Sequence, residues 1–282
     1  MALFYTVDTL QRPLLKARAE GQSIGFVPTM GALHSGHLSL VRKALEENDL
    51  VVVSIFVNPT QFDKEDDLQK YPAQLEEDVK LIEEIASDIL VFAPTAKEVY
   101  PQKMEAKQYN FEGLEKVMEG EFRTGHFDGV GTVVERLFEI CIPHRAYFGE
   151  KDFQQLQIIR KLVDLQGIDI DIVGCPIERE DHGLARSSRN ERLSPTAREK
   201  AGMIYAILKA ARDQFDQKNA EELNQWVIQQ FQEEESLELE YFEIADAHTL
   251  TPLMKRQTGQ KYRAFIAVYT EGVRLIDNIA LN

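Results

Sequence analysis

The chain has few cysteines, a deficit of positive charge and no long apolar run. Its 282 residues include two cysteines, Cys141 and Cys175, each within an apolar segment. Neither a disulfide framework nor a thiolate metal site is therefore expected, and both thiols are predicted to be buried. The formal net charge of -15 argues against a nucleic-acid surface, which requires clustered Lys and Arg. No segment approaches the roughly 18 to 20 apolar residues of a membrane span, and the N-terminus lacks the features of a secretory signal. We expect a cytoplasmic protein with neither nucleic acid nor membrane as its partner.

Strand-like and helix-like segments alternate through about residue 175. Residues 23–29 and 50–57 are predicted to be buried strands, and residues 38–48 carry apolar side chains at helical spacing. Further helices are expected over 73–86, 129–142 and 153–165, and further strands over 88–94, 145–150 and 168–174. This alternation predicts an α/β fold with a doubly wound, Rossmann-like parallel sheet, whose ligands bind beyond the carboxyl ends of the strands.

The pattern changes in the C-terminal third of the chain. Helix-like stretches and then strand-like stretches follow one another there, at 198–215, 220–232, 238–246, 262–270 and 273–279. A polar segment with Pro176 and Gly183 separates the two patterns. We therefore expect two domains, residues 1–177 with the parallel sheet and residues 178–282 with a smaller α+β fold.

The segment Pro28–His37 lies between the first buried strand and its helix. Gly31 and Gly36 let a ligand approach the backbone, and the start of the helix offers N–H groups to an anion such as a triphosphate. His34 and His37 fall on one side of a helical turn and could donate to phosphate oxygens during phosphoryl transfer. They could instead cap the turn, or bind zinc, for which no third ligand stands at an obvious spacing. The segment is a candidate nucleotide site with helix capping as the alternative.

Two later segments could also hold phosphate. Residues 148–155 follow a predicted strand, and Lys151 there can pair with a phosphate, although an N-capped helix explains the segment as well. Residues 184–190, near the expected domain boundary, place two serines between Arg186 and Arg189. This segment could donate to a pyrophosphate and close over a nucleotide, or it could be a solvated basic loop.

Two weaker candidates carry amide, guanidinium and imidazole groups. Asn58 and Gln61 follow the second strand, and their amides suit a small polar acid, although Asn-Pro is also an ordinary turn opener. Arg123 and His126 precede an apolar helix. Either could bind an anion, or the segment could simply lead into the helix.

Taken together, PTMGALHSGH, SIFVNPTQF, TGHFDGVGTVV, YFGEKDFQQL and ARSSRNERLSP resemble the pantothenate synthetase family, also called pantoate–β-alanine ligases. This family belongs to the HxGH nucleotidyl-transferase superfamily. The resemblance runs in order from about residue 20 to about residue 195. It implies that the carboxylate of (R)-pantoate attacks the α-phosphate of ATP, with Mg²⁺ assisting, to give pantoyl adenylate and pyrophosphate. The amine of β-alanine then displaces AMP and gives pantothenate. It also implies a homodimer in which residues 1–177 bind nucleotide and pantoate and residues 178–282 form a lid.

The resemblance also assigns roles to individual residues. The catalytic set is His37, as proton donor, with His34, Lys151, Ser187, Ser188 and Arg189. The ATP-binding set is Met30, Gly31, Ala32, Leu33, His34, Ser35, Gly36, His37, Gly149, Glu150, Lys151, Asp152, Glu178 (through its backbone), Arg186, Ser187, Ser188 and Arg189. The substrate-binding set is Gln61 and Gln155 for pantoate, with Gln61 also close to β-alanine, and more weakly Asn58, Tyr71 and Arg123. Residues that would hold the metal are not indicated.

Arg186 departs from the family pattern, in which Met or Leu usually precedes Ser-Ser-Arg. The change adds charge near the nucleotide and could shift the affinity for ATP.

Two other functions fit parts of the sequence. A different HxGH nucleotidyl-transferase would not need the pair Gln61 and Gln155, and a nucleotide-binding module without catalysis would not need so many donors to a transition state.

Overall fold

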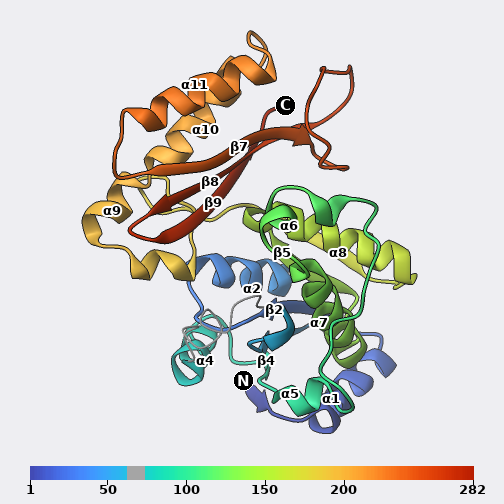
Figure 1. Ribbon diagram of the computed structural model, residues 1–282. Helices are drawn as coiled ribbons and strands as arrows, with labels where there is room; N and C mark the ends of the chain where they lie inside the picture. The colour runs from blue at the N-terminus through green and yellow to red at the C-terminus, as the bar shows by residue number, and fades with distance from the viewer. Residues whose placement is uncertain (62–73) are drawn as a thin grey trace. The chain divides into compact units, whose positions relative to one another are not determined.

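The computed structural model describes residues 1–61 and 74–282, which form two compact units (Figure 1). The first unit comprises residues 1–150 and 154–176, and the second comprises residues 151–153 and 177–282. Each unit has its own cluster of buried apolar side chains.

The first unit is built on a six-stranded sheet in which every neighbouring pair of strands is parallel. The strands are β1 (Ala2–Phe4), β2 (Ile24–Thr29), β3 (Leu50–Ile55), β4 (Leu90–Phe92), β5 (Arg145–Gly149) and β6 (Asp171–Cys175). Their spatial order is β1-β4-β3-β2-β5-β6. The chain adds β3 and β4 on one side of β2, and β5 and β6 on the other side. The carboxyl ends of β2 and β5 therefore flank a topological switch point, where such folds bind ligands. The predicted doubly wound α/β fold is confirmed.

Helices cover both faces of this sheet. On one face, α1 (Val7–Ala19) contacts α7 (His126–Cys141), whose Phe138 ring meets that of Phe26 edge-on at 6.3 Å. On the other face, Val41 of α2 (Ser35–Glu47) and Ile82 of α4 (Leu75–Glu83) pack in one cluster with Val27 of β2. Burial on both faces explains why the sequences of β2 and β3 are continuously apolar. Among the described residues, further helical segments are η1 (Pro59–Gln61), α5 (Ala96–Val99), η2 (Leu114–Lys116), α6 (Glu119–Phe122), η3 (Glu150–Asp152) and α8 (Phe153–Gln166).

Two elements near the N-terminus were not predicted from the sequence. The helix α1 carries Leu10, Leu14 and Ala17 on its buried side, but Pro13 lies inside it. Proline removes a helical hydrogen bond and usually ends a helix, so it conceals this one in the sequence pattern. The strand β1 is three residues long and pairs with β4 at the edge of the sheet.

The second unit combines helices with an antiparallel sheet of order β7-β8-β9. Its elements are η4 (Ser188–Arg192), α9 (Pro195–Lys200), α10 (Met203–Gln214), α11 (Ala220–Gln232), β7 (Glu238–Asp246), β8 (Tyr262–Thr270) and β9 (Val273–Ala280). The helices bury residues such as Leu208 against Ile266 and its neighbours in one cluster. From the alternate positions of β8, Arg263 and Phe265 contact Phe153, with the guanidinium carbon 3.9 Å from the ring centroid and the two rings 6.0 Å apart. These contacts explain why 151–153 group with this unit.

The prediction of a single helix over 198–215 was wrong, because the chain forms α9 and α10 with a break at Ala201 and Gly202. A Cβ atom at Gly202 would lie 2.5 Å from the carbonyl oxygen of His182. Glycine is required here so that the loop containing His182 can pass close to the break.

Both cysteines are buried and outside any disulfide, as predicted. Burial raises the pKa of Cys175 to about 11. Among residues 1–61 and 74–282, no helix has the length and apolar character needed to cross a membrane.

Candidate active site

A buried carboxylate fixes the backbone conformation of the loop that follows β2. Gly31 and Ala32 have φ angles of 84° and 50°, in the left-handed region. The fully buried Asp78 of α4 accepts hydrogen bonds from the backbone N–H groups of Ala32, at 3.0 Å, and Leu33, at 2.7 Å. Burial raises the pKa of Asp78 although these bonds act to lower it. A Cβ atom at position 31 would lie 2.9 Å from Asp78 Oδ2, so Gly31 leaves the room that this carboxylate needs.

Asp78 was not among the residues predicted to matter. It lies one helical turn before Ile82 on the buried side of α4. An acidic residue within the apolar stripe of an amphipathic helix is the sequence signal that could have revealed it.

The two histidines cap the helix that follows. His34 is the N-cap of α2, and its Nδ1 accepts from the N–H of Gly36 at 3.1 Å, while the Nδ1 of His37 accepts from the N–H of His34 at 3.3 Å. The two rings lie 4.1 Å apart between centroids. Because Nδ1 accepts in both rings, a neutral imidazole carries its proton on Nε2. Capping and phosphate binding therefore use different nitrogens, and the two interpretations are compatible.

The start of α2 favours an anion in two further ways. No acidic side chain occupies its first turn, so the positive end of the helix dipole is not compensated there. The hydroxyl of Ser35 is buried and makes no hydrogen bond within the described chain. Such a group at the carboxyl edge of the sheet is suited to a polar ligand.

Gln61 lies beside this loop. Its Nε2 is 2.7 Å from the sulfur of Met30, and its Oε1 accepts from Asn58 Nδ2 at 3.2 Å. The amide of Asn58 is only 1% exposed and also contacts the carbonyl of Gly129 and the hydroxyl of Tyr100, at 3.2 Å and 2.9 Å. Asn58 therefore supports Gln61 from within the protein, while Gln61 and Met30 belong to one small cluster at the switch point.

A second support reaches Gln61 from α7. The Nδ1 of His126 lies 2.9 Å from the carbonyl oxygen of Gln61, and its Nε2 lies 3.0 Å from Nη1 of Arg123. A carbonyl oxygen only accepts, so Nδ1 donates and Nε2 accepts from the guanidinium. The predicted residue Arg123 is thus linked to Gln61 through His126. Gly129 completes the packing, because a Cβ there would lie 2.2 Å from the carbonyl of Thr60.

The residues after β5 divide into supporting and accessible groups. Gln154 is 4% exposed, donates to the carbonyls of Leu114 and Val117 at 2.8 Å and 2.7 Å, and accepts from the N–H of Glu119. Gln155, the predicted pantoate ligand, is half-buried. Gln154 is thus engaged with the backbone, while the adjacent Gln155 is left partly accessible.

Lys151 is held by the second unit. Its carbonyl accepts from Nδ2 of the buried Asn278 at 2.9 Å, and Asn278 Oδ1 accepts from the guanidinium of Arg263. The ammonium group of Lys151 lies 3.5 Å from the carboxylate of Asp152, and its side chain is 15% exposed. The backbone of the predicted phosphate ligand is therefore fixed by β9.

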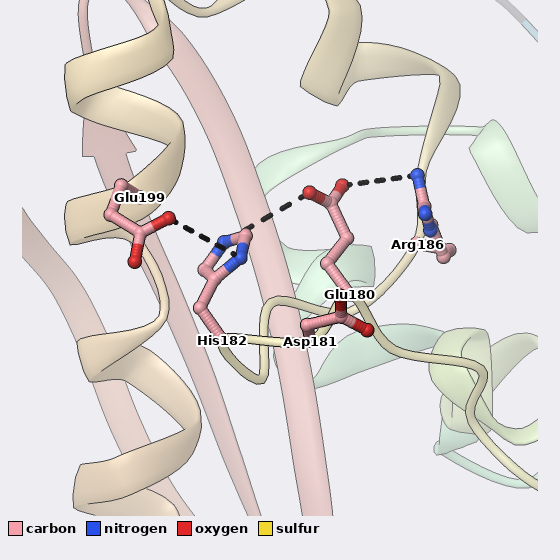
Figure 2. Close-up of a pocket in the computed structure, with 5 residues that line it drawn as sticks. All are labelled: Glu180, Asp181, His182, Arg186 and Glu199. Atoms are coloured by element: carbon pink, nitrogen blue, oxygen red, sulfur yellow. Dashed lines mark ion pairs between the residues drawn. The ribbon is translucent and has the colours of Figure 1, made fainter.

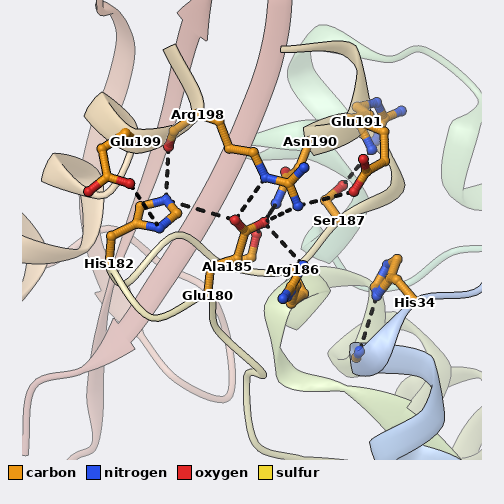
Figure 3. A network of polar contacts seen from close by, with 12 residues as sticks. His34, Glu180, His182, Ala185, Arg186, Ser187, Asn190, Glu191, Arg198 and Glu199 are labelled. Atoms are coloured by element: carbon orange, nitrogen blue, oxygen red, sulfur yellow. Dashed lines mark hydrogen bonds and ion pairs between the residues drawn. The ribbon is translucent and has the colours of Figure 1, made fainter. Parts of the chain in front are cut away.

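The predicted residues Glu178 and 186–189 lie in the second unit, and Figure 3 labels Arg186 and Ser187 among them. Ser187 caps η4 by accepting from the N–H of Arg189 at 3.3 Å. The N–H of Arg186 donates to the carbonyl of Glu178 at 2.9 Å. Residues 186–189 are all half-buried. The predicted Tyr71 lies outside the described residues.

Comparisons with known proteins point to one family. The sequence model of the pantoate–β-alanine ligase family matches residues 2–280. The pantothenate synthetase of Christiangramia forsetii is 58% identical over 282 residues, covering 100% of both chains, and that of Flavobacterium psychrophilum is 52% identical over 275 residues, covering 98% of this chain and 96% of the other.

Solved structures agree with these sequence matches. A crystal structure of pantothenate synthetase from Thermus thermophilus matches with a TM-score of 0.91 and 41% identity, covering 100% of this chain and 99% of the other. The pantoate–β-alanine ligase of Francisella tularensis, complexed with β-γ ATP and β-alanine, matches with a TM-score of 0.79 and 38% identity, covering 100% and 98%. The chain therefore belongs to the pantoate–β-alanine ligase family.

Proposed function

We propose that this protein condenses (R)-pantoate with β-alanine, using ATP, and so makes pantothenate, AMP and pyrophosphate through a pantoyl adenylate. The observation that carries the proposal is the pair His34 and His37 at the switch point, with Nδ1 of each ring engaged in capping and the proton on Nε2. Family membership over nearly the whole chain supports the choice of substrates.

In the first step, a carboxylate oxygen of pantoate bonds to the α-phosphorus of ATP as the bond to pyrophosphate breaks. Negative charge grows on the phosphate oxygens, and preorganised donors lower the energy of that state. His34 and His37 act as such donors, with His37 as the proton donor. Lys151 and the segment Ser187–Arg189 bind the departing pyrophosphate, while Met30–His37 and Gly149–Asp152 line the nucleotide.

Pantoate is a small hydroxy acid and requires amide and guanidinium partners. We assign this role to Gln61 and Gln155, with Gln61 also near the incoming β-alanine. Asn58 and His126 hold Gln61 in place, and Arg123 acts through His126. In the second step, the amine of β-alanine attacks the acyl carbon and AMP leaves with the bonding electrons. The protein contributes positioning and charge stabilisation, and needs no covalent nucleophile.

Further properties belong to the same proposal. Mg²⁺ accompanies the triphosphate, whose oxygens would hold it with water. Within residues 1–61 and 74–282, no group of three or more His, Cys, Asp or Glu is arranged to bind a metal. We also propose a cytoplasmic homodimer, with residues 1–177 as the nucleotide- and pantoate-binding domain and residues 178–282 as a lid domain.

Exchange of labelled pyrophosphate into ATP tests the function. Label should enter ATP only when pantoate is present, and β-alanine should not be needed, because the first step is reversible on its own. Exchange that ignores pantoate would overturn the substrate assignment.

A further inference from the structure

A buried carboxylate lies at the centre of a polar network in the second unit (Figures 2 and 3). Glu180 is 9% exposed and accepts from Arg198 through both Oε2, at 2.8 Å from Nε, and Oε1, at 2.9 Å from Nη2. It also accepts from Asn190 Nδ2 at 2.9 Å, and Nη1 of Arg186 lies 3.5 Å from its Oε1. With Asp181, His182 and Glu199, Glu180 and Arg186 line an open pocket.

The network joins two ends of a hairpin. Arg179 and Ala185 pair as an antiparallel bridge, and the turn between them includes Gly183, whose φ is 105°. Asn190 is 1% exposed and donates to both Glu180 and the carbonyl of Ala185, at 2.9 Å and 3.1 Å. Through its hydrogen bond with Asn190, Glu180 therefore connects the start of the hairpin to the end of the segment that carries Ser187–Arg189.

Charge explains why this position holds an acid. Burial acts to raise the pKa of Glu180, but the hydrogen bonds from Arg198 and Asn190 and the charges of Arg198 and Arg186 outweigh it, so the pKa lies below its ordinary value. Without the carboxylate, Arg186 and Asn190 would lose this acceptor, and Arg198 would be left with the exposed Glu191. The segment would then lose its fixed geometry.

Arg186 is part of the network but is not essential to it. Its Nη1 faces Glu180 at 3.5 Å, while its Nε is buried and makes no hydrogen bond in the described chain. A buried donor without an acceptor costs stability. The two shorter bonds from Arg198 would satisfy Glu180 if Arg186 were absent.

We infer that Glu180 is a positioning residue that fixes Ser187–Arg189 for binding the phosphates of ATP. This inference rests on the proposed function, because it takes Ser187–Arg189 as phosphate ligands. It differs from that function in naming residues that act without touching ATP.

The test compares variants of the full chain. In Glu180→Gln, the amide would face Arg198 and break the bond to Nε. The Kd of a non-hydrolysable ATP analogue, measured by calorimetry, should rise roughly tenfold or more, the scale of one charged hydrogen bond. The KM for ATP should rise with it, while the KM for pantoate should stay within about twofold. Glu180→Asp, which keeps the charge, should recover part of the affinity.

Glu191→Gln is the matched control. Glu191 also pairs with Arg198, at 3.0 Å, but its side chain is 72% exposed, so its removal should leave the Kd of the analogue unchanged. Asn190→Ala should weaken binding. Its effect combined with that of Glu180→Gln should be less than additive, because both substitutions act on the same hydrogen bond between Glu180 and Asn190.

Two outcomes would overturn the inference: a folded Glu180→Gln protein with wild-type affinity, or no binding of the analogue by the wild type. The proposed function fails separately. If the wild type binds the analogue but shows no pantoate-dependent exchange, the substrate assignment falls while the role of Glu180 is still decided by the Kd values.

Discussion

The carboxylate of Asp78 accepts the backbone N–H of Leu33 at 2.7 Å and so fixes the loop that leads into His34. It accepts the N–H of Ala32 as well, at 3.0 Å. One buried side chain from α4 thus holds two amides of the proposed nucleotide loop.

Replacing Asp78 with Asn should weaken nucleotide binding. An amide has one acceptor oxygen, so one of the two backbone N–H groups would face an NH₂ group instead. We expect the Kd of an ATP analogue to rise about tenfold, as for the loss of one buried hydrogen bond of about 1.5 kcal/mol. Glu77→Gln, one residue away on the exposed side of the helix, should bind normally. An unchanged Kd in folded Asp78→Asn would remove the proposed role.

The pH dependence of stability should have opposite signs at Asp78 and Glu180. The pKa of Asp78 is raised above its ordinary value of 3.8, so the folded state holds the proton more tightly than the unfolded chain. The stability of the wild type relative to Asp78→Asn should therefore fall as the pH rises from about 3.8 through the raised pKa. The pKa of Glu180 is lowered from 4.5, so the stability of the wild type relative to Glu180→Gln should fall as the pH drops below about 4.5. Urea unfolding between pH 3.5 and pH 8 measures both stability differences. If both differences changed with pH in the same direction, the raised pKa of Asp78 and the lowered pKa of Glu180 could not both be correct.

His37→Ala should reduce kcat by at least about 100-fold, the scale of losing one oriented donor. The substitution also removes the acceptor for the N–H of His34, which should lower the free energy of unfolding by about 1 kcal/mol. Turnover and thermal unfolding must therefore be measured together. His248→Ala changes an exposed histidine and should affect neither. If His37→Ala lost only a little turnover, the role of His37 would be limited to helix capping.

His126→Phe should raise the KM for pantoate about tenfold, because it breaks the link between Arg123 and the backbone of Gln61. His144→Phe is the matched control. The Nδ1 of His144 also holds one backbone group, the N–H of Ile24 at 2.9 Å, but at the opposite end of β2. Both variants should lose some stability, and only His126→Phe should change the KM for pantoate. Equal KM values in the two variants would assign His126 a purely structural role.

Two glycines of α7 should respond differently to alanine. In Gly129→Ala, the new Cβ would lie 2.2 Å from the backbone oxygen of Thr60 and must push η1 away from the helix. In Gly131→Ala, the Cβ would meet the rings of Tyr109 at 3.0 Å and of the buried Phe111 at 3.1 Å, and these side chains would have to shift by a few tenths of an ångström. Alanine gains about 1 kcal/mol of helix propensity in either case. We expect Gly129→Ala to unfold at a lower temperature and to bind pantoate weakly, and Gly131→Ala to stay close to wild type in both measurements.

The sequence by itself determined most of the elements and the location of the candidate site. The predicted segments 220–232 and 238–246 coincide with α11 and β7, because the spacing of apolar side chains is a local signal. The HxGH segment was placed at the start of a helix after a buried strand for the same reason, and its helix begins at Ser35.

Only the tertiary structure decided which polar side chains hold the backbone in place and which are left accessible. Asp78 and Glu180 are two among 47 acidic residues, and no local pattern shows which groups either of them binds. Their partners, such as Leu33 and Arg198, are far from them in the sequence and come into contact with them only in the folded structure. The same holds for the protons of His34 and His37, because the nitrogen that carries a proton is set by the hydrogen bond at the other nitrogen, and that bond exists only after the turn has formed.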